Sequence, residues 1–276
     1  MRAALLQLCS GDDPEANLTA TRAMLREAAA GGAGFVCTPE VTNCVSASRP
    51  RQQEVLRTEA EDPTLAALRD EAARAGIWLS VGSLALKTGD ADGRFANRSF
   101  LIAPDGQIAA RYDKMHMFDV TVSESETYRE SAGYRPGAQA VIADAGFARL
   151  GLSICYDIRF AYLYRALAQA GAQVLLVPSA FARPTGAAHW EVLLRARAIE
   201  TGAWVLAAAQ SGTHPTSTDK ARETWGHSMA VAPWGEVRLD MGEAPGVGYV
   251  DLDIPACETA RARIPALTHD RAFEGP

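Results

Sequence analysis

The stretch "ARLGLSICYDIRFAYLYRALAQAGAQ", residues 148–173, places a strand, a turn and a helix in direct succession. Residues 148–155 are nearly all apolar, as in a strand that is covered on both faces. The chain then becomes polar at once, and a helical pattern that begins near Asp157 runs to Gly171, a residue suited to a helix C-cap. Cys155 lies where strand gives way to turn, the edge at which α/β sheets place ligands. A buried core cysteine and a functional thiol both fit this position.

The same alternation continues outward from this unit. Helices are predicted from Pro14 to about Gly31 and from Pro63 to about Gly76, each preceded by an N-cap aspartate, and a further helix spans residues 187–202. Tight turns at 103–108 and 232–237 indicate antiparallel hairpins. Short apolar runs typical of buried strands occur at 3–8, 34–40, 77–86, 98–103, 173–180, 204–210, 227–232 and 248–254. Strands alternating with helices, with some hairpins, predict a mixed sheet in an α/β layered fold, and residues 1–276 are expected to form one domain.

Two segments carry more specific expectations. In the helix at 187–202, an apolar stripe is expected from Trp190, Leu193, Leu194, Ala198 and Ile199. Residues 115–140 show no periodicity, and a long irregular connection in a compact domain is often functional.

Composition excludes several function classes. The formal net charge is −6 and no run of basic residues occurs, so no nucleic-acid or anionic-membrane surface is expected. The five cysteines are scattered and contain no C-x-x-C pair, so neither a disulfide framework nor a metal site is expected. With no signal-peptide pattern or transmembrane-length apolar run, we expect a cytoplasmic protein.

Charged residues follow two other apolar strands. Pro39-Glu40 ends the run at 34–40, and Lys114 ends a hairpin strand. Taken singly, Glu40 could be a turn carboxylate and Lys114 a solvated surface lysine. The pattern is more specific when the three residues are taken together, because a carboxylate, an ammonium and the Cys155 thiol each end a strand of an α/β sheet. It predicts a shared catalytic site.

These residues lie in motifs that resemble those of the nitrilase superfamily of carbon–nitrogen hydrolases. The motifs are "PE" at Glu40, "YDK-H-FD" at Lys114 and "GLSICYDIRF" at Cys155, followed by "VLLVPSAF", "TGAAHWEVLLRARAIE", "AAAQSGTH", "GHSMAVAPWGEV" and "RARIPALTHDR". The resemblance covers nearly the whole chain. It implies a four-layer αββα sandwich, a homodimer or larger homo-oligomer, no cofactor, and a Glu40–Lys114–Cys155 catalytic triad.

The resemblance also assigns further site residues. The segment "YRES" aligns Glu130 with an additional active-site glutamate of the family. Tyr156 offers a backbone N–H to an oxyanion, and Arg159 corresponds to a residue that holds a substrate carboxylate. Phe181 and Thr185 align with residues that line the substrate pocket.

Three departures from the family pattern leave the acyl part of the substrate open. Arg183 stands where a small or polar residue is expected, the segment before Glu130 lacks the usual proline and glycine, and the C-terminal "THDRAFEGP" keeps only part of its motif.

The expected activity is hydrolysis of a small, carboxylate-bearing linear amide through a cysteine thioester. The later motifs resemble the branch that holds deaminated-glutathione amidases and omega-amidases, and lean towards the former. The alternatives are an omega-amidase acting on 2-oxoglutaramate-like amides, a non-catalytic binding or assembly member of the superfamily, and a papain-like hydrolase that uses His189 or His227. A nitrile hydrolase is disfavoured, because the later motifs resemble those of amidases.

Overall fold

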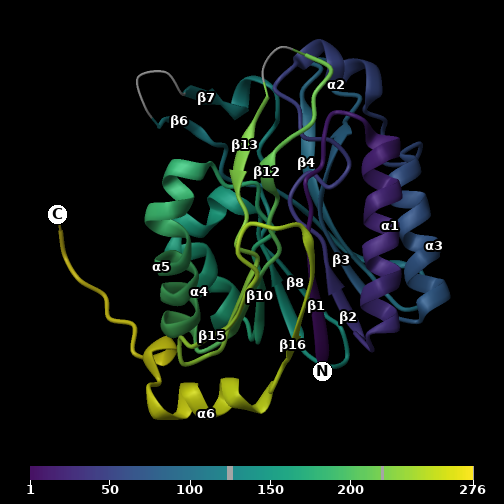
Figure 1. Ribbon diagram of the computed structural model, residues 1–276. Helices are drawn as coiled ribbons and strands as arrows, with labels where there is room; N and C mark the ends of the chain where they lie inside the picture. The colour runs from purple at the N-terminus through teal and green to yellow at the C-terminus, as the bar shows by residue number, and fades with distance from the viewer. Residues whose placement is uncertain (123–126, 219–220, 276) are drawn as a thin grey trace.

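The computed structural model describes residues 1–122, 127–218 and 221–275, which form two six-stranded sheets packed face to face with helices on both outer faces (Figure 1). This arrangement is the four-layer αββα sandwich expected from the sequence. The predicted hairpin turns at 103–108 and 232–237 join antiparallel strands in the first and second sheet respectively.

The two sheets have matching layouts, each with a parallel centre and antiparallel edges. The first has the order β16-β1-β2-β3-β4-β5, in which β1, β2 and β3 are parallel. Its strands are β1 (Arg2–Gln7), β2 (Phe35–Cys37), β3 (Trp78–Lys87), β4 (Phe95–Ile102), β5 (Ile108–Asp113) and β16 (Gly246–Asp251). The second has the order β15-β14-β11-β10-β9-β8, in which β9, β10 and β11 are parallel. Its strands are β8 (Val141–Asp144), β9 (Arg149–Leu152), β10 (Val174–Leu176), β11 (Trp204–Ala207), β14 (Met229–Val231) and β15 (Val237–Asp240).

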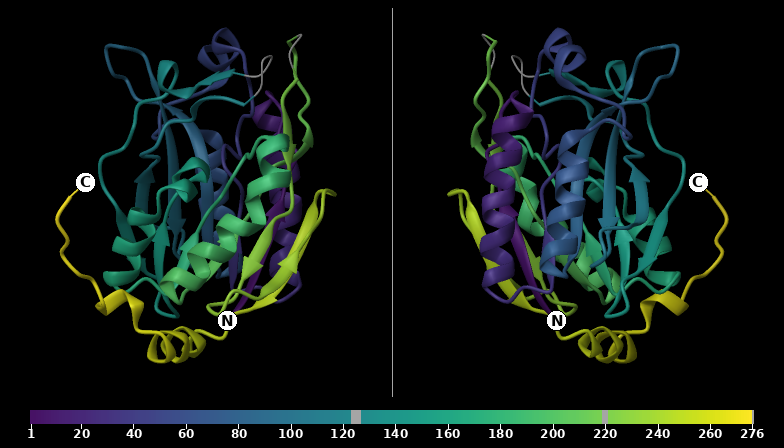
Figure 2. Two further views of the ribbon diagram at one scale, coloured as in Figure 1. Left: turned by 90° about the vertical axis from the view of Figure 1, so that its left-hand side faces the viewer. Right: turned by 90° about the vertical axis from the view of Figure 1, so that its right-hand side faces the viewer.

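Two pairs of helices cover the outer faces of the sandwich, as the turned views in Figure 2 show. The pair α1 (Pro14–Ala30) and α3 (Pro63–Ala75) covers the first sheet, and the pair α4 (Ala161–Gln169) and α5 (Arg183–Thr201) covers the second. Strand β1 illustrates the layering, because its alternate side chains enter different cores. Ala3 and Leu5 join the core between the sheets, whereas Ala4 and Leu6 join the core beneath α1 and α3.

The helix boundaries follow the capping residues of the sequence. The side chain of Asp13 accepts hydrogen bonds from the backbone at the start of α1, and that of Asp62 does the same for α3. Helix α3 ends at Gly76, whose φ of 63° places it in the left-handed region that glycine adopts at little cost. None of the helices in the described ranges is both long and apolar enough to cross a bilayer.

Several local features differ from the expectations. Helix α5 begins at Arg183, four residues before the start of the predicted helix. The chain after Cys155 first makes a 3-10 turn (Cys155–Arg159), and α4 begins only at Ala161 rather than near Asp157. Ile199 is 56% exposed on α5, on the opposite side from buried Trp190. The helix α2 (Arg49–Val55) was not predicted, although Ser48 caps it.

A further difference concerns the stretch expected to be irregular, 115–140, of which residues 123–126 lie outside the described ranges. It contains a short hairpin of β6 (Asp119–Thr121) and β7 (Thr127–Arg129), followed by a 3-10 turn (Glu130–Ala132). A second small hairpin, β12 (Ser211–Thr213) and β13 (Glu223–Trp225), lies at the same end of the sandwich (Figure 1), and α6 (Pro255–Arg263) lies at the other end.

The sheets approach each other closely where their parallel strands end. Gly82 in β3 has no room for a side chain: a Cβ there would lie 2.0 Å from the carbonyl oxygen of Thr38 and 2.5 Å from Cβ of Pro178. Thr38 follows a strand of the first sheet and Pro178 one of the second. This contact brings the chain segments after β2 and β10 together, and both segments enter the site described next.

Candidate active site

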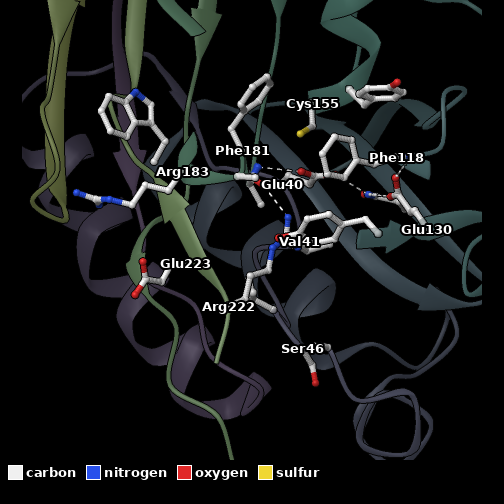
Figure 3. Close-up of a pocket in the computed structure, with 18 of the residues that line it drawn as sticks. Glu40, Val41, Ser46, Phe118, Glu130, Cys155, Phe181, Arg183, Arg222 and Glu223 are labelled. Atoms are coloured by element: carbon white, nitrogen blue, oxygen red, sulfur yellow. Dashed lines mark hydrogen bonds between the residues drawn. The ribbon is translucent and has the colours of Figure 1, made fainter. Parts of the chain in front are cut away.

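The three predicted catalytic residues follow strands that end at one edge of the sandwich. Glu40 comes three residues after β2, Lys114 directly after β5, and Cys155 three residues after β9. All three side chains are buried, with exposed fractions of 4%, 2% and 6%. They line one cavity of about 850 Å³, together with Glu130 (Figure 3).

Lys114 is held between two carboxylates. Its Nζ lies 2.9 Å from Oε1 of Glu40 and 3.0 and 2.9 Å from the two carboxylate oxygens of Glu130. Glu130 is fixed in turn by the backbone N–H of Phe118, which donates to its Oε2 at 2.6 Å. A buried ammonium is tolerated because these partners compensate its charge.

Glu40 makes further hydrogen bonds that fix both of its oxygens. Nδ2 of Asn97 donates to Oε1 at 2.8 Å, and the backbone N–H of Ala180 donates to Oε2 at 2.8 Å. Asn97 belongs to the first sheet, whereas Ala180 follows β10 of the second. The carboxylate is thus bonded to both sheets, and its orientation depends on how they pack.

Cys155 and the residue after Glu40 have unusual backbone conformations. Cys155 has φ of 50° and Val41 has φ of 47°, in the left-handed region that costs non-glycine residues free energy and that clusters at functional sites. Hydrogen bonds hold both conformations. The N–H of Cys155 donates to the carbonyl of Pro178 at 2.9 Å, and that of Val41 to Oγ of Ser83 at 2.8 Å.

Asp157 stabilises the turn that carries Cys155. It is fully buried, and its carboxylate accepts hydrogen bonds from the hydroxyl of Tyr112 at 2.6 Å and from the backbone N–H of Ile154 at 2.8 Å. The backbone N–H of His116 donates to it at 3.1 Å, and Nδ1 of His116 lies 2.6 Å from the same oxygen. Because Ile154 and Asp157 lie on either side of Cys155 in the chain, these contacts hold the backbone that carries the thiol.

The electrostatics of the site keep the carboxylate charged and the thiol neutral. Burial opposes ionisation of Glu40, but the charges of Lys114 and Arg222 outweigh it and lower the pKa of the carboxyl. Burial likewise opposes the charge of Lys114, yet Glu130 and Glu40 raise its pKa well above the usual value. Burial and the adjacent Glu40 charge raise the pKa of Cys155, which Lys114 offsets only in part.

Of the four predicted substrate-binding residues, two line the cavity and two do not. Tyr156 and Phe181 line the cavity. Arg159 and Thr185 are not among the described residues that line it. The Arg159 guanidinium packs on the rings of Tyr156 and Phe181, and its Nη2 lies 3.3 Å from Nδ1 of His189. The Thr185 hydroxyl donates to the backbone carbonyl of Ala182, the residue before α5.

The sequence interpretation missed Asn97, Asp157 and Arg222. Asn97 comes directly before the predicted run at 98–103 and is followed by Arg98 and Ser99, so the sequence does not distinguish it from its polar neighbours. Asp157 lies within the same motif as Cys155. Arg222 precedes β13 in a stretch without periodicity, and the sequence around it carries no signal for a place in the cavity.

Neither histidine of the papain-like alternative lies on the cavity wall as far as the structure describes it. His189 contacts Arg159, and His227 pairs with Asp240 and stacks on Trp225. Across the described ranges, no three His, Cys, Asp or Glu side chains are grouped so that they could hold a metal ion.

The chain belongs to the carbon–nitrogen hydrolase family, whose model matches residues 2–262. It is 38% identical over 269 residues to a deaminated glutathione amidase of Yersinia enterocolitica, covering 97% of this chain and 92% of that protein. It is 36% identical over 274 residues to human omega-amidase NIT2, covering 98% and 95%.

The fold is likewise similar to that of a solved member of the superfamily. The crystal structure of the Caenorhabditis elegans NitFhit protein matches with a TM-score of 0.90 and 35% identity. The match covers 98% of this chain but 65% of the nematode protein, so the chain spans about two thirds of that protein's length.

The raised pKa predicts that Cys155 is a thiol, not a thiolate, in the resting protein. A raised pKa keeps the proton on sulfur to higher pH, whereas an unperturbed cysteine ionises near pH ~8.5. The ultraviolet thiolate absorbance of the wild-type protein minus that of Cys155→Ala should therefore show no titration step between about pH 6 and 9. A step in that interval would contradict the electrostatics described above.

Proposed function

We propose that this chain hydrolyses a linear amide through a Glu40–Lys114–Cys155 triad, with an acyl-thioester intermediate on Cys155. The observation that carries the proposal is the buried ammonium of Lys114 bonded to Glu40 and Glu130 beside the thiol, in one cavity. Isolating these charges from water is costly, and catalysis supplies a reason to keep them.

The first half of the reaction forms the thioester. The thiol of Cys155 passes its proton to Glu40 as sulfur attacks the amide carbonyl, and the carbonyl oxygen takes up the negative charge. Lys114 has three N–H donors, which all face Glu40 and Glu130. Giving up one of its two contacts with Glu130 frees a donor for this oxygen while Lys114 stays bonded to both carboxylates. The backbone N–H of Tyr156 precedes the first hydrogen bond of the 3-10 turn, from Asp157 to Ile154, and is the second donor to the oxyanion.

The second half releases the acid. Glu40 gives its proton to the departing nitrogen as the carbon–nitrogen bond breaks, which leaves the acyl group on sulfur. Glu40 then takes a proton from water as the water oxygen attacks the thioester carbonyl. Collapse of this second intermediate breaks the carbon–sulfur bond, and the proton on Glu40 returns to Cys155. Throughout, Glu130 acts as a positioning residue that fixes Lys114.

Replacement of the triad should abolish amide hydrolysis without unfolding the chain. Cys155→Ala removes the nucleophile and Glu40→Gln the proton acceptor, and each should lower kcat at least about a thousandfold in an ammonia- or amine-release assay. His189→Asn and His227→Asn are the controls, and they should keep most of the activity. Turnover by Cys155→Ala equal to that of the wild type would eliminate the thioester, and loss in either histidine variant alone would favour the papain-like alternative.

For the substrate, we propose an amide of the deaminated-glutathione type. The cavity of about 850 Å³ lies near the upper end of the ~300–1,000 Å³ found for small-molecule sites, which leaves room for a peptide-like amine beyond the scissile bond. The similarity to the Yersinia amidase supports the same choice. The alternative is a small 2-oxo acid amide, supported by the similarity to the human omega-amidase.

Competition between the two amides should separate these substrates. We expect kcat/KM for deaminated glutathione to exceed that for 2-oxoglutaramate, because only the larger amide contacts the outer part of the cavity. The measurement is the ratio of products when both compounds are present together. A higher kcat/KM for 2-oxoglutaramate would assign the omega-amidase activity instead, and turnover of neither, with no covalent labelling of Cys155, would favour a non-catalytic member.

We also propose that the protein is a homodimer or a larger homo-oligomer. Large apolar side chains are exposed on the outer helices, among them Val192 and Ile199 on α5 and Tyr162 on α4. Light scattering on the purified protein should give at least twice the mass of one chain, and Val192→Glu should shift it towards the monomer because a buried charge destabilises an apolar interface. A monomeric wild type at micromolar concentration would refute the proposal.

A further inference from the structure

Arg222 places a cationic group in the wall of the cavity, close to Glu40. Its Nη2 donates to the carbonyl oxygen of Ala180 at 2.7 Å, and the N–H of the same residue donates to Glu40. One residue therefore links the guanidinium to the catalytic carboxylate. Figure 3 shows the Arg222 side chain pointing towards Glu40, whereas Arg183 and Glu223 lie farther from the triad.

The guanidinium of Arg222 is incompletely satisfied within the protein. It carries five N–H donors, and its buried Nε has no hydrogen-bond partner among the described residues. No ion pair of Arg222 with a carboxylate occurs in the described ranges. Unmade hydrogen bonds of a charged group cost free energy, so an arginine in this state calls for a partner that enters with the ligand.

Among the described residues, none of the other cations of the cavity wall has a buried donor left without a partner. Lys114 is bonded to Glu40 and Glu130. Arg183 forms a two-point pair with Glu243, at 2.9 and 3.1 Å. Arg129 is exposed and donates to backbone carbonyls.

We propose that Arg222 is the specificity-determining residue that binds a carboxylate on the acyl part of the substrate. This inference rests on the proposed amidase function and moves the carboxylate-binding role from Arg159, which lies outside the cavity wall, to a residue within it. A guanidinium offers parallel donors that match the two oxygens of a carboxylate, and such pairs are among the stronger hydrogen-bonded contacts.

The acyl side of the substrate is assigned because of where Arg222 lies. Arg222 is near Glu40, whereas Ser46, Arg183 and Glu223 line a part of the cavity farther from the triad. The proposal places the larger leaving amine in that more distant part and the acyl chain beside Arg222. A group bound at Arg222 therefore stays bound while the acyl chain is attached to Cys155. Substrates that lack the carboxylate leave Nε of Arg222 unsatisfied, because among the described residues the guanidinium then keeps only its bond to Ala180 and its contact with the ring of Tyr128.

The test measures binding, so it does not depend on turnover. In the Cys155→Ala protein, dissociation constants are measured by calorimetry for glutaramate, which has an amide at one end and a carboxylate at the other, and for its neutral methyl ester. Adding Arg222→Gln should weaken the binding of glutaramate by about 10- to 100-fold, the range for a lost charge-assisted contact. The binding of the ester should be nearly unchanged. Arg222→Lys keeps the charge but not the two-point geometry, so its affinity for glutaramate should lie between those of the Cys155→Ala parent and the Arg222→Gln variant.

Two matched controls remove the same charge elsewhere. Arg159→Gln tests the position implied by the family resemblance, and Arg183→Gln removes a cavity-wall cation that is already paired. Both should retain the preference for glutaramate over the ester.

Several outcomes would overturn the inference. An equal loss of affinity for both compounds in Arg222→Gln would assign Arg222 to support of Glu40. A loss of glutaramate affinity in Arg159→Gln, with none in Arg222→Gln, would return the role to Arg159. The third outcome is a Cys155→Ala parent that does not prefer glutaramate to the ester or does not bind it measurably. If Arg222→Gln selectively weakens glutaramate binding but the wild-type protein hydrolyses no amide, the carboxylate site stands and the amidase proposal is rejected. If the wild-type protein hydrolyses amides but Arg222→Gln has no selective effect, the amidase proposal stands and the carboxylate site is rejected.

Discussion

The site depends on one buried ion pair network, in which Lys114 lies between Glu40 and Glu130. None of the three charges could be buried alone without a large desolvation cost, and removing Lys114 would leave both carboxylates uncompensated. The network therefore fixes the distance and orientation of its members. It also sets the protonation states beside Cys155: a charged carboxylate that can accept a proton and a neutral thiol that can give one.

The face-to-face packing of the two sheets makes this network possible. Glu40 and Lys114 extend from the first sheet, while Cys155 and the backbone of Ala180 extend from the second. The hydrogen bond from Ala180 to Glu40 crosses between the sheets. The close contact at Gly82 holds these segments at a separation that any side chain would increase. Relative movement of the sheets would thus separate the Glu40 carboxylate from the Cys155 thiol.

The same cross-sheet contact connects chemistry to recognition. Ala180 donates to Glu40 and accepts from Arg222, so the proposed carboxylate site and the proposed catalytic base share one residue. Arg222 also contributes, after Lys114, to the lowered pKa of Glu40. A substrate carboxylate at Arg222 would neutralise part of that influence, which ties the basicity of Glu40 to whether the cavity is filled.

The sequence by itself determined the layered α/β fold, the ends of α1 and α3 and the strand-end positions of Glu40, Lys114 and Cys155. These follow from local signals: Asp-Pro starts, glycine C-caps, apolar runs and motifs that a single segment carries. It could not determine the 3-10 turn after Cys155, because contacts of Asp157 with distant Tyr112 decide it. The tertiary structure alone placed Arg222 in the cavity and Arg159 outside it, since side-chain position there depends on how segments from different sheets pack, and no local periodicity records that packing.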